Sequence, residues 1–371
     1  MITAPPSTSG PKAGDAQAVL TIDLAALAEN WRQLAMRVAP ATCAAVVKAD
    51  AYGIGIEAAV PALVAAGCKV FFVAHVSEAR RVRALDSKVD IYVLNGLLPT
   101  AVEPCLALNL RPVLGSLSEA RLWVAAAGAA PCALHVDTGM KRLGAGLAEI
   151  PDLAALRLNA DLLMTHFVAS ENPGDPLNRQ QIERFAEIRA LLPPMRASLA
   201  NSSALFLPEQ PFGDLVRPGY ALYGGNPTPG LDNPMRAVLR LDAPILQTRV
   251  IEAGEKVGYN AQWTANRRTR LATIGIGYAD GLPRQAMSTD AKPGGEAIVA
   301  GHRVPFAGRV SMDLTVLDIT DVPETDVRAG TRACLLGPEI SIDDLGARAG
   351  TIGYEVLTRL GQRYHRVYVT E

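Results

Sequence analysis

Eight short apolar runs recur along residues 44–218, and this alternation limits the fold of the chain more than any other feature. Most runs are separated by stretches with helical character, such as SEARRVRALD and LNRQQIERFAEIRALL. Strands that alternate with helices in this way form parallel sheets. Eight such units over about 200 residues favour a closed (β/α)8 barrel, because an open doubly wound sheet usually has fewer strands and a GxGxxG turn that we do not find. The expected strands are 44–48, 70–74, 91–94, 111–114, 132–137, 161–167, 196–201 and 214–218.

Local signals also predict where helices begin. Residues 19–23 (VLTID) have the pattern of a strand, and Asp23 is placed to cap a helix whose apolar side chains fall on one face. Two later helical stretches open on serines, Ser77 and Ser116, whose hydroxyls can accept a hydrogen bond from the first turn. We therefore expect a helix directly after each of these three residues.

A cluster of Gly, Pro, Asn and Asp at residues 224–234 is the expected boundary between two domains. Beyond it, short strands are divided by turn residues, with one helical insert near residues 341–360, as in a small mainly-β domain. The first 17 residues are rich in Pro, Ser, Gly and Ala and lack the apolar core of a signal peptide. The chain is thus expected to comprise a flexible arm (1–17), a barrel domain (18–230) and a C-terminal mainly-β domain (231–371).

The charge of the chain is nearly balanced, with 36 Lys and Arg residues against 37 Asp and Glu residues. A chain without a basic stripe has little affinity for a polymer of phosphates, so nucleic acid is not an expected partner. No apolar run reaches the roughly 18 residues that span a bilayer, and a membrane is not expected as a partner either. The five cysteines lie far apart without a CxxC pair, which indicates reduced thiols, a cytoplasmic location and no metal site.

The run AVVKADAYGIG at residues 45–55 places one lysine, Lys48, at the end of an apolar strand and directly before a turn. A lysine in a partly dry position loses solvation of its charge, so its amine is available as a base or as a Schiff-base nucleophile. The alternative is an ordinary strand-end lysine whose side chain reaches water. The choice depends on what lies at the ends of the other strands.

Other polar residues follow the carboxyl ends of later strands, where barrel enzymes carry their catalytic groups. Asp137 ends the fifth run, His166 lies near the end of the sixth and Arg217 ends the eighth. Ser202 and the Gly219 amide lie in the loops after the last two strands, where barrels tend to bind phosphate. A lysine for a Schiff base, donors for a phosphate and an arginine near a histidine together point to pyridoxal 5'-phosphate. Taken singly, His166 could be a buried structural histidine and Arg217 part of an ion pair at the barrel rim.

Eight short motifs occur in the order seen in alanine racemases: AVVKADAYGIG, VDTGMKRLG, MTHF, ANSSA, VRPGYALYG, GYADG, SMD and GYEVL. On these motifs, which cover nearly the whole chain from about residue 18, the chain resembles the alanine racemase family. The resemblance implies a pyridoxal phosphate-dependent racemase of fold type III that interconverts L- and D-alanine, with D-alanine serving as a peptidoglycan precursor. A broad-specificity or serine racemase of the same fold is the nearest alternative.

The resemblance also assigns roles to individual residues. Lys48 would carry the cofactor, and Arg142 would reach both the phenolic oxygen of the cofactor and the substrate. Arg217 would face the pyridine nitrogen and would be oriented by His166. The other residues implied to bind the cofactor, most of them around its phosphate, are Tyr52, Asn201, Ser202, Gly219, Tyr220 and Tyr354.

Tyr278 in GYADG and Met312 in SMD would come from the partner subunit, because the family builds each active site across a homodimer. Inversion at a carbon atom needs bases on opposite faces, and Lys48 and Tyr278 would be that pair. Met312 would bind the substrate carboxylate through its backbone. The alternative for Tyr278 is an aromatic core residue at a strand end, although Gly277 and Gly281 around it indicate an exposed turn.

His135 is the main departure from the family pattern, in which many members have a lysine that is carbamylated and pairs with the following arginine. A histidine cannot form this stable carbamate, so Arg142 must find another acceptor. Three further departures, at Asn260, Leu282 and Ser311, concern the fine specificity and not the reaction.

Two other functional classes stay open on the sequence. A non-catalytic pyridoxal phosphate carrier would resemble only the barrel, whereas this chain continues into a second domain with the GYADG and SMD motifs. An amino-acid decarboxylase of a related fold would carry a glycine-rich phosphate loop and a cysteine in a late motif, and Cys334 instead lies in an apolar strand.

Overall fold

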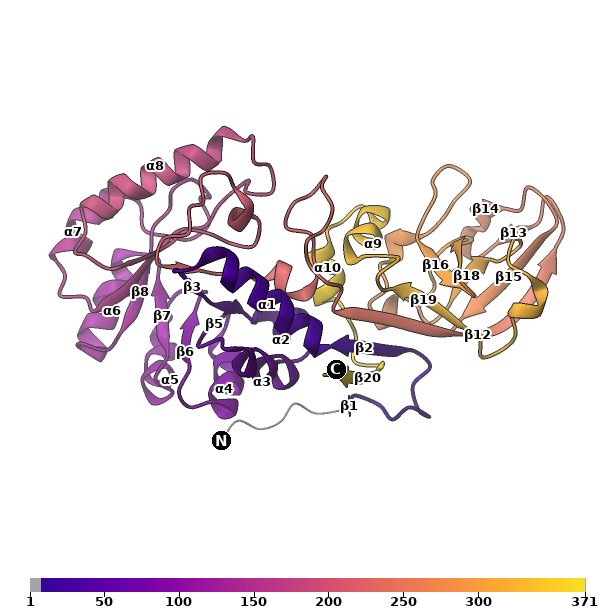
Figure 1. Cartoon of the computed structure of the whole chain (residues 1–371), viewed down its shortest axis with the longest axis horizontal. Helices are drawn as coiled ribbons and strands as arrows, with labels where there is room; N and C mark the ends of the chain where they lie inside the picture. The colour runs from indigo at the N-terminus through magenta and orange to yellow at the C-terminus, as the bar shows by residue number, and fades with distance from the viewer. Residues whose placement is uncertain (1–7, 371) are drawn as a thin grey trace.

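The computed structural model of the protein describes residues 8–370, in two parts that lie side by side (Figure 1). One part consists of helices and parallel strands between residues 24 and 223, and the other is built mostly from strands after residue 238. Seven residues of the expected arm at 1–17 lie outside the described residues. The remainder of that segment includes a short strand, β1 (Thr8–Ser9), which pairs with the last strand of the chain.

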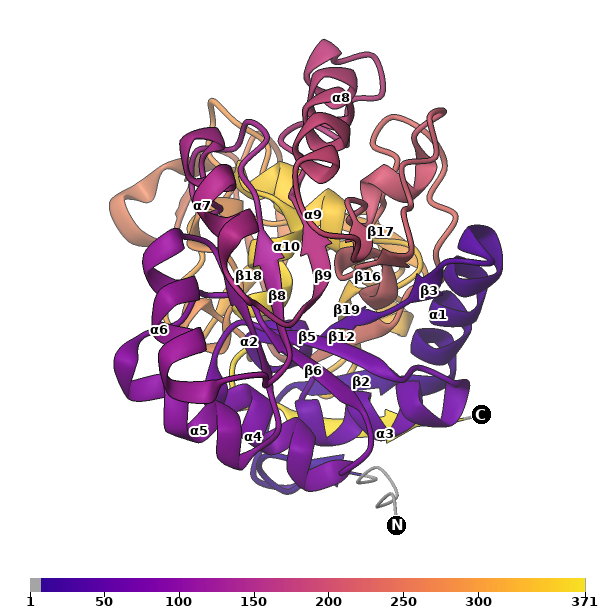
Figure 2. The same cartoon turned by 90° about the vertical axis from the view of Figure 1, so that its left-hand side faces the viewer.

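Parallel strands curl around the centre of the N-terminal part (Figure 2). Seven of them are hydrogen-bonded in the order β10-β9-β8-β7-β6-β5-β4, and an eighth, β11, pairs in parallel with β3. Backbone hydrogen bonds from Ala44 to Val216 (3.0 Å) and from Arg217 to Ala200 (2.9 Å) join the β11 segment to both ends of this sheet, so the expected (β/α)8 barrel is confirmed. The first barrel strand is divided into β3 (Thr42–Cys43), which pairs with β11, and β4 (Ala45–Val46), which pairs with β5. The other barrel strands are β5 (Val70–Val73), β6 (Asp90–Val93), β7 (Arg111–Leu114), β8 (Cys132–His135), β9 (Ala160–Met164), β10 (Arg196–Ser198) and β11 (Leu215–Val216).

The barrel strands are apolar along most of their length because both faces of the sheet are covered. All residues of β5 and β8 are buried. Phe72 and Tyr92, on neighbouring strands, stack with their ring centroids 4.7 Å apart. These strands form a rigid frame, and a side chain that directly follows one of them is held in place by it.

Helices follow the strands and cover the outside of the barrel (Figure 2). Asp23 caps α1 by accepting a hydrogen bond from Ala26 N–H (2.7 Å), and Ser116 caps α6 by accepting one from Glu119 N–H (3.2 Å), as expected. The helices of this part are α1 (Leu24–Val38), α2 (Lys48–Tyr52), α3 (Ile56–Ala66), α4 (Val76–Leu85), α5 (Val102–Ala107), α6 (Leu117–Ala127), α7 (Ile150–Ala155) and α8 (Pro176–Ala190).

The prediction that Ser77 caps a helix is wrong. Helix α4 begins at Val76, and its N-cap residue is His75. The reason is Glu78, whose carboxylate accepts the N–H groups of Ala74 (2.8 Å) and His75 (3.2 Å) and so fixes an earlier start.

The C-terminal part is built on a sheet with the order β1-β20-β2-β12-β19-β16-β17, in which β12 also pairs with β15 and β15 with β18. The expected strand β2 (Val19–Asp23) lies in this sheet between β20 and β12, although its residues precede the barrel. Two short helices, α9 (Ile342–Ala349) and α10 (Gly353–Thr358), form the expected helical insert. The remaining strands are β12 (Leu239–Ile251), β13 (Lys256–Val257), β14 (Trp263–Thr264), β15 (Thr269–Ile274), β16 (Glu296–Val299), β17 (His302–Pro305), β18 (Thr315–Asp318), β19 (Arg332–Leu336) and β20 (His365–Val369).

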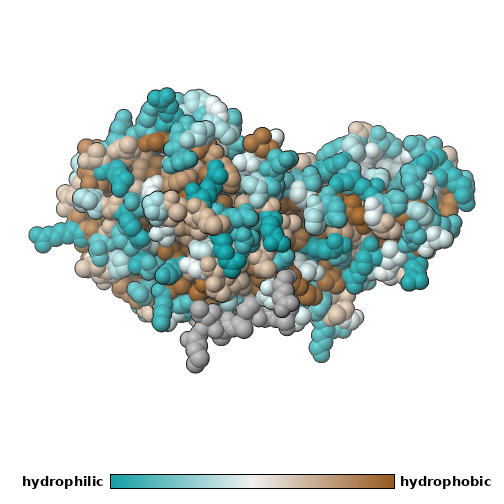
Figure 3. Space-filling model, viewed as in Figure 1, coloured by the Kyte–Doolittle hydropathy of each residue, from teal (hydrophilic) through white to brown (hydrophobic). Residues whose placement is uncertain are grey.

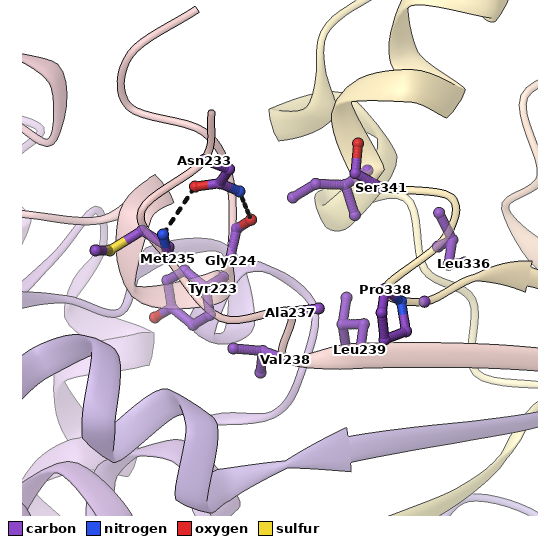
Figure 4. A pocket seen from close by; sticks show the side chains of 12 residues that line it. Tyr223, Gly224, Asn233, Met235, Ala237, Val238, Leu239, Leu336, Pro338 and Ser341 are labelled. Carbon is purple, nitrogen blue, oxygen red and sulfur yellow. Dashed lines mark hydrogen bonds between the residues drawn. The ribbon is translucent and has the colours of Figure 1, made fainter. Parts of the chain in front are cut away.

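The loop at residues 224–234 joins the two parts and lines a cavity of about 300 Å³ (Figure 4). Asn233 fixes this loop, because its side-chain oxygen accepts Met235 N–H and its amide donates to the Gly224 carbonyl, both at 2.9 Å. Pro338 and Ser341 line the cavity from the C-terminal part. The cluster of turn residues therefore forms an ordered connection between the two parts.

The surface of the molecule is mixed in character. Hydrophilic and hydrophobic side chains are interspersed on the face shown in Figure 3. Within residues 8–370, no helix combines the length and the hydropathy that crossing a membrane requires.

Candidate active site

A cavity of about 790 Å³, here called the barrel cavity, lies where the barrel strands end and reaches helix α10 of the C-terminal part. His135, which departs from the family pattern, lines it. Asp137 is not among the lining residues, and its carboxylate accepts the Gly139 N–H of its own turn (2.8 Å). The ten residues expected to bind the cofactor all line the barrel cavity: Lys48, Tyr52, Arg142, His166, Asn201, Ser202, Arg217, Gly219, Tyr220 and Tyr354.

Lys48 lies two residues beyond the end of β4 and is the first residue of α2. The expected strand 44–48 is thus shorter, and Lys48 begins the turn instead of ending the strand. Burial lowers the pKa of Lys48, and the positive charge of Arg142 lowers it further, while Glu78 acts in the opposite sense. A larger share of the Lys48 amine is therefore neutral, as a base or a nucleophile must be.

The segment after Lys48 has a backbone conformation that the sequence did not indicate. Residues 49–52 have φ values between 52° and 56°, in the left-handed region, although none of them is glycine. Gly53 ends the turn with a φ of 85°, and a Cβ atom there would lie 2.3 Å from the Leu357 carbonyl oxygen. The residues Ala-Asp-Ala-Tyr carry no local signal for a left-handed turn, so the glycines that follow were the only sign of a change in direction.

Ser202 and Gly219 form the part of the barrel cavity that suits a phosphate. The buried hydroxyl of Ser202 accepts hydrogen bonds from the N–H groups of Gly219 (3.0 Å) and Ala221 (3.2 Å). A Cβ atom at position 219 would lie 2.4 Å from the Tyr52 hydroxyl, so this close approach requires glycine. Backbone N–H groups next to a hydroxyl are typical of anion sites.

Arg217 is buried, and neutral oxygen atoms accept its hydrogen bonds. Its guanidinium donates to the hydroxyl of Ser198 and to the carbonyl oxygens of Thr165 (2.5 Å) and Leu199 (3.3 Å). Ser198 in turn donates to the Leu215 carbonyl (2.6 Å). Sequence reasoning missed Ser198, because its residue type in a short strand gives no sign of a charged neighbour. Burial lowers the pKa of Arg217 to about 9, which still leaves it protonated at neutral pH.

The two histidines of the barrel cavity are neutral at neutral pH. Burial lowers the pKa of His135 to about 4 and that of His166 to about 3, and the charge of Arg217 is the second cause in both cases. A neutral His135 brings no negative charge to Arg142. Among residues 8–370, the guanidinium of Arg217 makes no hydrogen bond to His166, so the orienting role of His166 stays a prediction.

Three of the expected cofactor-binding residues are fixed by contacts with other protein groups. The ring of Tyr354, from helix α10, stacks on Tyr220 with a centroid distance of 3.8 Å, and the Tyr220 hydroxyl donates to Asp343 (2.6 Å). The side-chain oxygen of Asn201 accepts the Ser170 hydroxyl (2.9 Å). These contacts leave one wall of the cavity rigid and aromatic.

Tyr278 and Met312 lie elsewhere in the molecule. Tyr278 belongs to the glycine-flanked turn 277–281, here called the Tyr278 turn, and its N–H donates to the Ser311 carbonyl (2.9 Å). Both side chains are exposed, by 39% for Tyr278 and 53% for Met312, and neither lines the barrel cavity. Tyr278 instead lines a separate hollow with Arg359. The fold of one chain therefore does not bring these two residues to Lys48.

Two models of known protein families together match most of the chain. The family model described as alanine racemase, N-terminal domain, matches residues 22–227, and the model described as alanine racemase, C-terminal domain, matches residues 238–368. The chain belongs to the alanine racemase family. The resemblance noted in the sequence is thus confirmed.

Individual alanine racemases are similar to this chain over nearly its whole length. The alanine racemase of Methylobacterium nodulans is 52% identical over 358 residues, which cover 94% of this chain and 95% of that protein. The crystal structure of alanine racemase from Bartonella henselae with covalently bound pyridoxal phosphate has a TM-score of 0.90 and 37% identity, covering 95% of this chain and 100% of that chain. The structure of the Acinetobacter baumannii alanine racemase has a TM-score of 0.88 and 30% identity, covering 95% and 100%.

Proposed function

We propose that the protein interconverts L- and D-alanine with pyridoxal 5'-phosphate as its cofactor. The observation that carries the proposal is the barrel cavity, where Lys48, the phosphate-suited loop at Ser202 and the buried Arg217 line one space. Family membership supports the same reaction.

The lining residues fit this cofactor at three points. The amine of Lys48 suits the aldehyde of the cofactor, and the Ser202 hydroxyl, whose oxygen accepts the Gly219 and Ala221 N–H groups, is placed to donate to its phosphate. The guanidinium of Arg217 is a donor that suits the pyridine nitrogen. When bound, the cofactor would withdraw electrons from the substrate and so acidify its α-proton.

Lys48 and Tyr278 of the partner subunit are the proposed bases. Inversion requires that a proton leave one face of the α-carbon and arrive on the other, so two bases on opposite faces are needed. The lowered pKa of Lys48 suits an amine that takes up a proton. Arg142 and the backbone of Met312 of the partner subunit are proposed to hold the substrate carboxylate.

Arg217 is proposed to limit the chemistry to racemisation. With a pKa of about 9 and neutral acceptors around it, the guanidinium stays protonated at neutral pH. It therefore does not readily give a proton to the ring nitrogen, as the carboxylic acid of many other pyridoxal enzymes does. Weaker electron withdrawal by the ring should suppress transamination.

A homodimer with two shared sites is also part of the proposal. Its support is the placement of the exposed Tyr278 and Met312 outside the barrel cavity of their own chain. In this arrangement residues 18–230 bind the cofactor and residues 231–371 complete the partner's site. We further propose a cytoplasmic enzyme that supplies D-alanine for peptidoglycan; the five free, buried cysteines suit a reducing compartment.

The test is to incubate pure protein with single L-amino acids in deuterated water and to follow product chirality and α-proton exchange. Alanine should be racemised fastest, with deuterium entering at the α-carbon, because a bulky Tyr354 ring beside the substrate side chain would favour a methyl-sized group. Faster turnover of serine, or similar turnover of many amino acids, would favour the broader racemases. Cofactor binding without any exchange would favour a carrier and contradict the proposal.

A further inference from the structure

The left-handed turn after Lys48 is a costly conformation that needs support. Residues 49–52 are four consecutive L-amino acids with positive φ, where each Cβ approaches the following carbonyl oxygen. A single residue of this kind is uncommon outside glycine, and a run of four persists only when contacts around it hold it. The turn carries Lys48 at one end and Tyr52 at the other, and both line the barrel cavity.

The contact nearest to Lys48 is made by Glu78. One carboxylate oxygen of Glu78 accepts the N–H of Ala49, the residue directly after Lys48, at 2.6 Å. The other oxygen accepts the N–H groups of Ala74 (2.8 Å) and His75 (3.2 Å), which directly follow strand β5. A single carboxylate thus joins the first residue of the turn to the frame of the barrel.

Other contacts hold the far side of the turn. Asp50 accepts the Ile56 N–H (3.1 Å) and pairs with Arg81 (2.6 Å). The buried Arg366, from strand β20, donates to the Gly53 carbonyl (2.7 Å). These contacts fix where the turn ends, whereas the carboxylate of Glu78 fixes where it begins, one peptide unit from the lysine.

We propose that Glu78 is a positioning residue for Lys48, which holds the left-handed turn so that the lysine amine faces the cofactor in the barrel cavity. The inference rests on the proposed role of Lys48 in cofactor attachment. Both oxygens are needed, because they accept from segments on two different strand ends. A glutamine in this position would keep the shape of the side chain but would turn an N–H₂ donor toward one of these N–H groups. The single oxygen of a glutamine is expected to stay at the start of α4, where it keeps two hydrogen bonds, and to leave Ala49 N–H facing the N–H₂ group, so Glu78→Gln should release the turn.

Glu119 provides a matched control. It occupies the same position at the start of α6, and its carboxylate accepts the Gly115 N–H (2.6 Å), without contact to the lysine turn. Glu119→Gln should thus loosen the start of its own helix and leave Lys48 unaffected. The comparison separates the general effect of losing such a carboxylate from the effect on the turn.

The first measurement is amide hydrogen exchange of the apoprotein, resolved by peptide. Exchange in residues 48–55 should be faster by about tenfold or more in Glu78→Gln and unchanged in Glu119→Gln, because hydrogen bonds to a charged acceptor are the stronger ones. Exchange near Gly115 should show the reverse pattern. Unchanged exchange of residues 48–55 in Glu78→Gln would overturn the proposal, independently of how fast the cofactor becomes attached to Lys48.

The second measurement is the rate at which pyridoxal phosphate becomes attached to Lys48, trapped with borohydride and located by peptide mapping. Glu78→Gln should attach the cofactor about tenfold more slowly than Glu119→Gln, because a misplaced Lys48 amine is not aligned with the cofactor aldehyde. Each variant is assayed at the same number of degrees below its own melting temperature. Equal rates in the two variants would overturn the positioning role. A parent protein that takes no label at Lys48 would instead contradict the proposed function, and the exchange experiment would still decide on Glu78.

Discussion

The barrel cavity holds Lys48 and Arg217 in largely buried surroundings, whereas Tyr278 and Met312 lie exposed on the C-terminal part. The Tyr278 turn is nevertheless well fixed, because Asp280 accepts the Gly277 N–H (2.9 Å) and pairs with Arg363 (2.7 Å). The Tyr278 side chain is thus held in a fixed position but lies 39% exposed, outside the barrel cavity of its own chain. This difference agrees with the proposed homodimer, in which each chain would supply one half of a site and a second copy would supply the other.

The largest effect is expected from Lys48→Ala, which removes the proposed cofactor attachment and one proposed base together. Racemisation of alanine should fall by about 10⁴-fold. Borohydride reduction of the parent protein should leave the pyridoxyl label on Lys48. Label on another lysine, or a variant with undiminished activity, would show that the barrel cavity is not the centre of the reaction.

Tyr278→Phe should lower racemisation by about 10²- to 10⁴-fold, because it removes the proposed base on the opposite face. Subunit exchange between this variant and Lys48→Ala gives heterodimers with one intact site. Activity should therefore return on mixing. If heterodimers form and activity does not return, Lys48 and Tyr278 do not act together across subunits.

Ser198→Ala should have a smaller effect within the barrel cavity. It leaves a buried N–H of Arg217 without its acceptor, which should lower kcat/KM about tenfold. Ser288→Ala is the control, since Ser288 is also buried and accepts the Gly294 N–H (2.8 Å), but in the C-terminal part. Equal activity of the two variants would mean that Ser198 acts on stability alone.

The buried histidines should make the protein less stable in acid. The pKa of His135 is about 4 in the folded protein against about 6.5 unfolded, so the unfolded chain binds more protons between these values. The stability contributed by the neutral ring is thus present above about pH 6.5 and is lost as the pH falls toward 4. His135→Asn should show a shallower fall of the melting temperature between pH 7 and pH 4, and an equal slope would contradict this assignment.

The smallest effect is expected from bicarbonate, which should leave the activity of the parent protein unchanged. His135 cannot form the carbamate that would pair with Arg142, and its neutral ring offers no charge in its place. His135→Lys should gain a carbamate signal with ¹³C-labelled bicarbonate. Strict bicarbonate dependence of the parent, or a carbamate on another residue next to Arg142, would contradict the prediction.

Much of the barrel could be predicted, because its strands and helices are local patterns. Nine of the ten residues predicted to bind the cofactor lie in motifs that follow barrel strands, and the tenth, Tyr354, lies in helix α10 of the C-terminal part; all ten line one cavity. Contacts between distant segments escaped prediction. The hydrogen bonds between Glu78 and Ala49 and between Ser198 and Arg217 could not be predicted, because no local sequence pattern indicates them. The same holds for the left-handed turn, in which only Asp50 is of a residue type that adopts this conformation more often than most.

Strand β2 also shapes how the molecule is assembled during synthesis. It lies between β12 and β20, and both of these strands follow the whole barrel in the sequence. Strand β2 precedes the barrel, so it can pair with neither of them until the barrel residues have been synthesised. In topological terms the barrel is an insertion into the β domain, and contacts of such long sequence separation form slowly. A chain cut in the loop at 224–234 would leave β2 on one fragment and both of its neighbours on the other. Strand β20 therefore pairs with β1 and β2, strands more than 340 residues earlier in the sequence.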